Sequence, residues 1–202
     1  IGEVWSDSMT LSTLFRGLPS LFNFELTKTI PECIHAADAG RLIEPYLNII
    51  KAYQSAGVPF EDAILLSNHD MNRIRSTLGG DIQKAKLAAA ILLTLPGTPY
   101  IYYGEEIGML GIKPDIHLRE PFLWEEDPLK DTRWQKSTYS IRPEVESLEV
   151  QMSDPNSIYH HYKKWISLRN DHPELARGTP VFQNLQNNAI LAWIIREKKK
   201  SI

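Results

Sequence analysis

Apolar residues recur along the chain with two different spacings, and the alternation between them predicts an order of strands and helices. Short apolar runs typical of strands occur at residues 1–5, 20–27, 63–66 and 99–103. Apolar residues three and four positions apart, which are typical of amphipathic helices, occur within residues 41–57, 79–97 and 158–175. Strands that alternate with helices in this way indicate βαβ units and a parallel sheet.

The outer two of these predicted helices each carry one apolar face. In residues 41–57 the face holds Leu42, Ile43, Tyr46, Leu47 and Ile50. In residues 158–175 it holds Ile158, Tyr162, Trp165 and Ile166. The helix between them is predicted to begin after Asp81, a typical N-cap residue, and to end at Pro96 and Gly97.

The rest of the chain departs from this alternation. Residues 105–157 show little periodicity over about fifty residues, far more than a usual loop between a strand and a helix. Residues 179–199 predict two strands joined by a polar run at 186–188. Two folds stay open, a doubly wound sheet and half of a TIM barrel. Polar residues recur where strands end, and barrel enzymes place their chemistry at the C-terminal ends of strands.

Composition and charge exclude several classes of protein. The 202 residues are 43% hydrophobic and 23% charged, which is ordinary for a globular chain of one or two domains. A net charge of -3 does not suggest a nucleic-acid partner. The one cysteine, Cys33, allows no disulfide within the chain, and no apolar run is long enough for a membrane span. No zinc spacing or phosphate loop occurs, so no metal site is predicted.

The predicted strand at residues 63–66 leads into three polar residues, Asn68, His69 and Asp70. A carboxylate and an imidazole at a buried strand end are unfavourable unless they are paired or used in chemistry. Two interpretations therefore stay open: a functional site, or a polar loop that caps the next helix.

Glu3 occupies a similar position in the first predicted strand. Its neighbours are apolar, and apolar surroundings favour the neutral form of a carboxyl group, which a general acid needs. The alternative is an exposed glutamate at a frayed chain end. In a barrel, Glu3 and the neighbouring His69 and Asp70 would converge over the mouth. Paired carboxylates with a histidine suit the cleavage of glycosidic bonds.

Three segments, IGEVW at residues 1–5, LLSNHDMNR at 65–73 and LPGTPYIYYGEEIGM at 95–109, resemble in this order the later signature regions of the α-amylase family of glycoside hydrolases. KPDIHLREPFLW at 113–124 is similar to the segment after the eighth strand in bacterial α-amylases. The resemblance extends over essentially the whole chain. It implies an α/β fold in which residues 1–176 form the C-terminal half of a TIM (β/α)8 barrel, strands 5 to 8. Residues 178–202 would begin an all-β C-terminal domain.

The resemblance also implies roles for single residues. Glu3 would be the general acid and base, and Asp70 the third carboxylate, which stabilises the transition state. His69 would bind sugar hydroxyls, Asn68 would help hold the turn, and the motif around Glu105 would be mostly scaffold. The implied enzyme is a retaining hydrolase of α-1,4-glucosidic bonds in starch or maltooligosaccharides.

One part of the family pattern is missing from the chain. The family's nucleophile is an aspartate in a Gly-x-Arg-x-Asp pattern after strand four, and no such pattern occurs here. We therefore expect Ile1 to be a cut inside strand five and residue 202 to be a cut inside the C-terminal domain. Such a fragment would be inactive alone and would hold no cofactor, and any calcium ligands would lie in the missing N-terminal half.

The long segment at residues 105–157 is expected to contribute to the site, because long loops in compact domains are usually functional. Asp115 and Arg119 are predicted to contact substrate, and Glu120 is a further candidate. Four aromatic residues offer flat faces for sugar rings, although each is better explained as a residue that pins the segment to the barrel: Phe122, Trp124, Trp134 and Tyr139.

Several related functions stay open. Within the family these are an α-glucosidase, an oligo-1,6-glucosidase and a trehalose-forming isomerase. A non-catalytic amylase-like protein and a carbohydrate-binding module are alternatives of other classes, and the presence of Glu3, His69 and Asp70 argues against the first of them. The expected partner is an α-glucan or oligosaccharide, with no nucleic acid and no membrane span. A secreted or surface-attached bacterial enzyme is favoured over a cytoplasmic one.

Overall fold

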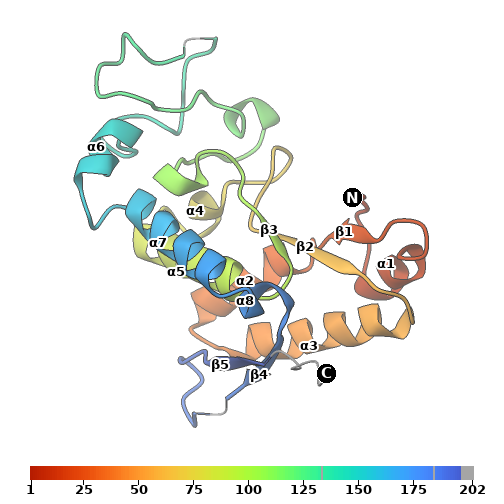
Figure 1. Ribbon diagram of the computed structural model, residues 1–202. Coiled ribbons are helices and arrows are strands. Elements are labelled where there is room, and N and C mark those ends of the chain that lie inside the picture. Colours follow the sequence, from red (N-terminus) through yellow and green to blue (C-terminus); the bar gives the residue numbers. More distant parts are fainter. Residues whose placement is uncertain (133, 184, 197–202) are drawn as a thin grey trace. The chain divides into compact units, whose positions relative to one another are not determined.

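The computed structural model describes residues 1–132, 134–183 and 185–196 (Figure 1). The chain divides into two compact units, which are described separately. The first contains Ile1–Leu65, Ile91–Tyr100 and the described part of Arg169–Ile202, and the second contains Leu66–Ala90 and the described part of Ile101–Leu168.

A parallel sheet forms the centre of the first unit. Its strands are β1 (Ser20–Phe22), β2 (Glu61–Leu65) and β3 (Thr98–Tyr100), in the order β1-β2-β3. Ser20 pairs with Glu61, and Ala63 pairs with Thr98. The predicted α/β order and the three strands are thus confirmed. The prediction of a strand at residues 1–5 is wrong. Of these residues only Gly2 pairs with the sheet, through a single bridge to Leu21, and one bridge does not make a strand.

Helices cover more of the first unit than the sequence predicted. α1 (Ser8–Leu14) was not expected, and α2 (Leu26–Ala36) begins within residues 20–27, which were assigned to one strand. The backbone N–H of Leu26 donates to Asn23 Oδ1 at 3.2 Å, so Asn23 ends the strand and starts the helix. The side-chain amide of Asn23 also donates to the buried Asp62 at 3.1 Å. Burial raises the pKa of the Asp62 carboxyl to about 7.

The predicted helix at residues 41–57 is confirmed as α3 (Gly40–Ser55), but its buried face is rotated from the predicted one. Leu42 and Tyr46 are buried as expected, together with Ile49 and Tyr53. Leu47 is 47% exposed, so its assignment to the core was wrong. From Tyr46, the buried face continues to Ile49 and then Tyr53, at steps of three and four residues, which is the helical period.

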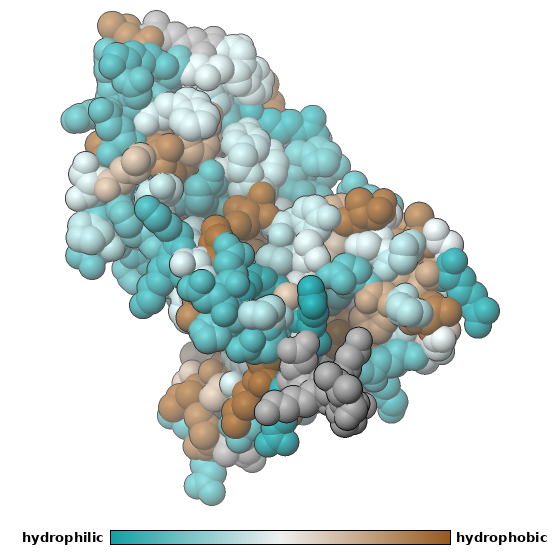
Figure 2. All heavy atoms as spheres, viewed as in Figure 1, coloured by the Kyte–Doolittle hydropathy of each residue, from teal (hydrophilic) through white to brown (hydrophobic). Residues whose placement is uncertain are grey.

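A two-stranded antiparallel hairpin completes the described part of the first unit, beside the short helix α8 (Glu174–Arg177). β4 (Thr179–Phe182) pairs with β5 (Trp193–Arg196), as predicted. The expected continuation of β5 into residues 197–199 lies outside the described residues. Figure 2 shows hydrophobic surface over the region of β4 and β5. The proposed domain boundary near residues 176–178 stays a prediction.

The second unit is mostly irregular, as predicted for residues 105–157. Besides the short helices α4 (Ile74–Thr77), η1 (Glu105–Ile107), η2 (Asp115–His117) and α6 (Leu148–Ser153), it contains most of α5 (Ile82–Thr94) and α7 (Ile158–Asp171). The irregular segment has its own core of Ile107, Met109, Leu123 and Val145. The segment is therefore held by packing as well as by its ends.

The two long helices largely follow the sequence. Asp81 accepts from the backbone N–H of Gln83 at 2.8 Å and of Lys84 at 3.1 Å, which confirms the predicted cap of α5. In α7 the predicted Ile158 and Tyr162 are buried, whereas Ile166 is exposed. Within the described residues, none of the helices is both apolar enough and long enough for a membrane crossing.

Candidate active site

The turn that follows β2 brings three of the predicted site residues to the surface of the second unit. Asn68 Oδ1 accepts from the backbone N–H of Asp70 at 2.9 Å, so the Asn68 side chain closes the turn on itself. The His69 side chain is 51% exposed and that of Asp70 is 39% exposed. His69 Nε2 lies 3.4 Å from Asp70 Oδ2, which places an imidazole and a carboxylate side by side and open to a ligand.

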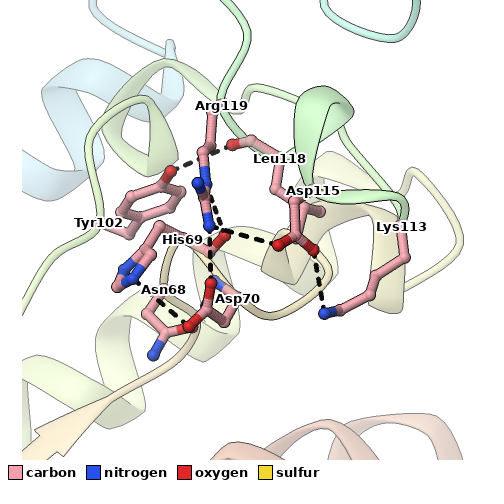
Figure 3. A network of polar contacts seen from close by, with 8 residues as sticks. All are labelled: Asn68, His69, Asp70, Tyr102, Lys113, Asp115, Leu118 and Arg119. Atoms are coloured by element: carbon pink, nitrogen blue, oxygen red, sulfur yellow. Dashed lines mark hydrogen bonds and ion pairs between the residues drawn. The ribbon is translucent and has the colours of Figure 1, made fainter.

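Arg119 joins this turn to the long irregular segment (Figure 3). Its Nη2 donates to Asp70 Oδ1 at 2.8 Å and to Asp115 Oδ2 at 3.3 Å. Its Nε donates to the carbonyl oxygen of His69 at 3.2 Å. The structure thus brings together five of the predicted residues, Asn68, His69, Asp70, Asp115 and Arg119.

Asp115 is held ionised by its neighbours. Lys113 Nζ donates to Asp115 Oδ1 at 3.0 Å. This hydrogen bond, followed by the charges of Lys113 and Arg119, lowers the pKa of the Asp115 carboxyl. Lys113 was not among the predicted residues, because a lysine near a proline has no distinctive pattern. The network therefore offers carboxylates, a guanidinium and an imidazole, all of which hydrogen-bond hydroxyl groups.

Tyr102 supports the network from the segment after β3. Its hydroxyl donates to the carbonyl oxygen of Leu118 at 3.1 Å, next to Arg119 (Figure 3). The sequence pointed to Tyr102 only as part of a scaffold motif. Its contact gives that scaffold a specific task, which is to fix the backbone that carries Arg119.

Glu3 belongs to the first unit. It follows Gly2, whose backbone bonds to both Ser20 and Phe22 at the edge of the sheet. The Glu3 side chain is exposed, so the apolar neighbours in sequence do not enclose it and the expected apolar surroundings are wrong for this chain. Trp5, two residues on, stacks on Phe24 at 3.8 Å, and these two rings help line an open pocket of about 430 Å³.

Glu120 is not a surface residue, which corrects its candidacy for substrate contact. The side chain is fully buried. Its two carboxylate oxygens accept from the backbone N–H groups of Thr138, Tyr139 and Ser140 at 2.7 to 3.2 Å. Glu120 therefore pins two parts of the long segment together, because those amides would otherwise lack partners.

The aromatic residues of the long segment divide into two groups. Phe122 packs against the local core, and Tyr139 lies 5.2 Å from the ring of His117. Trp124 and Trp134 are both more than half exposed. Among the described residues, no three His, Cys, Asp or Glu side chains are grouped so as to hold a metal ion.

Comparison with known proteins identifies the family. The model of the alpha amylase catalytic domain matches residues 1–178. The chain therefore belongs to the α-amylase family of glycoside hydrolases, which confirms the resemblance seen in its motifs.

Individual relatives agree with this assignment. The chain is 40% identical to Alpha-amylase 3 of Dictyoglomus thermophilum, over 100% of its own length and 41% of the relative's. It is 32% identical to the 4-alpha-glucanotransferase of Thermotoga neapolitana, over 100% of its length and 46% of the relative's. The chain thus spans less than half of the length of these relatives.

A solved structure gives the same result. The α-amylase from H. orenii superimposes with a TM-score of 0.91 at 36% identity, over 98% of this chain and 41% of that one. Because the superposition covers 98% of this chain, the similarity extends to the irregular segments as well as to the sheet.

Proposed function

We propose that the complete protein in which this chain occurs is a retaining glycoside hydrolase that cleaves α-1,4-glucosidic bonds in starch or maltooligosaccharides. The observation that carries the proposal is the exposed Asp70, which follows a parallel strand and lies beside both His69 and Arg119. Relatives that bear the name α-amylase and cover the whole chain support it. Residues 1–176 would then supply strands 5 to 8 of a TIM barrel, and residues 178–202 the start of an all-β domain.

The proposed mechanism assigns one task to each group. Glu3 protonates the glycosidic oxygen while a carboxylate outside this chain attacks the anomeric carbon, and Glu3 then takes a proton from the attacking water. The negative charge of Asp70 stabilises the oxocarbenium-like transition state. His69, Asp115 and Arg119 hold sugar hydroxyls. Because the nucleophile is assigned outside the chain, we expect residues 1–202 alone to be inactive.

The test is the substitution Glu3→Gln in the complete protein. The amide cannot protonate the leaving oxygen, so kcat on maltooligosaccharides should fall about 10³-fold or more while oligosaccharide binding persists. Glu32→Gln, on the exposed side of α2, is the matched control and should keep the wild-type rate. If Glu3→Gln weakened oligosaccharide binding but left kcat unchanged, the role of Glu3 as general acid would be refuted. A wild-type protein that releases no reducing ends from any α-glucan would refute the function itself and favour a non-catalytic protein.

A transfer reaction is the second candidate, because a 4-alpha-glucanotransferase is 32% identical over the whole chain. Hydrolysis and transfer share the first half of the mechanism and differ in the acceptor, which is water or a sugar hydroxyl. Incubation with maltotriose distinguishes them. New reducing ends indicate hydrolysis, whereas longer oligosaccharides at a constant number of reducing ends indicate transfer.

A further inference from the structure

The turn that carries Asp70 is flanked in sequence by two buried polar residues. Ser67 precedes Asn68 and is 2% exposed, and Arg73 follows the turn and is fully buried. Both belong to the second unit, as does the segment from Tyr103 to Gly111 that they contact. The exposed turn therefore has two buried ends, and what holds those ends decides where Asp70 points.

The first end is held by a side-chain hydrogen bond. Ser67 Oγ donates to Glu105 Oε1 at 2.5 Å, and both residues are buried. Glu105 opens the short helix η1 and lies 38 positions from Ser67 in sequence. This contact therefore fixes the start of the turn to a distant segment, which backbone geometry alone cannot do.

The second end is held by Arg73. Its Nη1 donates to the carbonyl oxygen of Tyr103 at 2.6 Å, and its backbone N–H donates to the carbonyl oxygen of Gly111 at 3.0 Å. The guanidinium also lies 4.7 Å from the ring centres of both Tyr102 and Tyr103. Contacts of this kind stabilise a desolvated cation.

Some polar atoms at the buried ends of the turn lack hydrogen-bond partners, which destabilises the folded state. Arg73 Nε, Arg73 Nη2 and Glu105 Oε2 have no hydrogen-bond partner among the described residues. Each unpaired buried polar atom lowers the stability of the fold. Well-packed apolar side chains would often give the same or greater stability. A defined direction of the turn, rather than stability, accounts for polar residues at these buried positions.

We propose that Ser67, Arg73 and Glu105 are positioning residues that fix both ends of the turn at residues 68–72, and so aim the Asp70 carboxylate at the sugar. The inference rests on the proposed function, since it assigns the turn to transition-state stabilisation. All three are buried, so none of them is expected to touch the substrate. Their effect on turnover therefore passes through Asp70.

The decisive variant is Ser67→Ala in the complete protein. A displacement of Asp70 by a fraction of an ångström should lower kcat by about 10- to 100-fold, while KM changes by less than about threefold. The matched control is Ser157→Ala. Ser157 is another buried serine of the same unit, and its Oγ donates to the carbonyl oxygen of Gln151 at 2.8 Å. It should lose similar thermal stability and keep kcat.

Glu105→Gln is a conservative substitution that should keep the hydrogen bond from Ser67. Burial raises the pKa of the Glu105 carboxyl to about 8, so this carboxyl is largely neutral at pH 7 and an amide resembles it. The amide oxygen still accepts from Ser67. We therefore expect kcat within about threefold of wild type, in contrast to Ser67→Ala. Equal losses of kcat in Ser67→Ala and Ser157→Ala would overturn the proposal.

A readout independent of activity separates this proposal from the proposed function. Amide hydrogen exchange across residues 68–72 should be at least about tenfold faster in Ser67→Ala than in wild type, and unchanged in Ser157→Ala. An unchanged turn in Ser67→Ala would overturn the positioning role, whatever the activity. If the turn exchanges faster in Ser67→Ala but the wild-type protein cleaves no α-glucan, the result would support the role of Ser67 in fixing the turn. It would refute only the proposed function.

Discussion

The exposed network around Asp70 and the buried charged residues of the same unit consist of the same types of side chain, carboxylates and guanidinium groups. Their surroundings differ completely. Asp70, Asp115 and Arg119 have side chains 39% to 47% exposed and pair with one another through charges. Arg73, Glu105 and Glu120 are at most 2% exposed and bond mainly to backbone groups and one serine. Both sets lie in the second unit.

The difference separates two uses of charge. Exposed ion pairs contribute only about 0 to 1 kcal/mol to folding, so stability does not explain a cluster of three of them around one turn. Buried polar groups are desolvated, and the hydrogen bonds that they make have defined partners, so they fix geometry. We infer that the exposed set serves a ligand and that the buried set holds the turn and the long segment in place.

The substitution Asp70→Asn in the complete protein tests most directly whether the exposed set serves a ligand rather than stability. The amide keeps the size and loses the charge, so kcat should fall about 10³-fold, whereas the free energy of unfolding should change by less than about 1 kcal/mol. Steady-state kinetics and urea unfolding measure the two quantities. A variant that unfolds far more easily but turns over normally would place Asp70 with the buried set.

Glu105→Gln tests the buried set through its dependence on pH. The folded-state pKa of Glu105 is raised above its unfolded value, so the folded state holds a proton that the unfolded state has lost between about pH 4.5 and 8. Wild-type stability from this group is therefore complete below that window and falls as pH rises through it. Glu105→Gln should be more stable than wild type at pH 8 by roughly 4 kcal/mol, with little difference at pH 4. Parallel stability curves would show that Glu105 ionises freely.

Glu120→Gln should have a smaller effect that is confined to the long segment. The new amide group turns one acceptor into a donor that faces the backbone N–H groups of Thr138 to Ser140, so about 2 kcal/mol of stability should be lost. Thermal unfolding measures the loss, and limited proteolysis should cut within residues 120–140 sooner than in wild type. Cleavage at other positions first would contradict this role.

Lys113→Met should have the smallest effect. The Lys113–Asp115 pair is exposed, so stability should change by less than about 0.5 kcal/mol. The pKa of Asp115 should rise because its hydrogen bond and nearest positive charge are gone. An NMR titration of the Asp115 carboxyl carbon measures this shift, and an unchanged pKa would show that Arg119 alone holds the group ionised.

The sequence predicted those parts of the fold whose signals are local. The period of α3 lies within the helix, the Asp81 cap of α5 lies next to its first turn, and the strand exit at Asn68 to Asp70 lies within one short stretch. The strand at residues 1–5 failed because a strand exists only through its pairing, and Gly2 makes one bridge. The start of α2 at Leu26 was hidden because Phe22, Phe24 and Leu26 alternate as a strand would.

The sequence named residues of the exposed network more completely than the buried residues that hold it. Asp70 was named from a motif and Arg119 from its place in the long segment, although their contact spans 49 positions. The buried role of Glu120 was missed, because its partners are backbone amides and every residue type but proline has one. Lys113 and Ser67 are common residues whose importance comes from what they meet in space. Such partners leave no pattern in a single sequence.

The parallel pairing of the central sheet also bears on how fast the molecule assembles. Ser20 pairs with Glu61 and Ala63 with Thr98, so each ladder joins residues roughly forty positions apart. The chain loses the entropy of closing these loops before any strand contact stabilises it. We expect the amides of α3 to gain protection early in refolding and those of β2 to gain it in the slowest phase. Pulsed hydrogen exchange would reveal the order, and simultaneous protection of both would mean that the sheet guides the helices from the start.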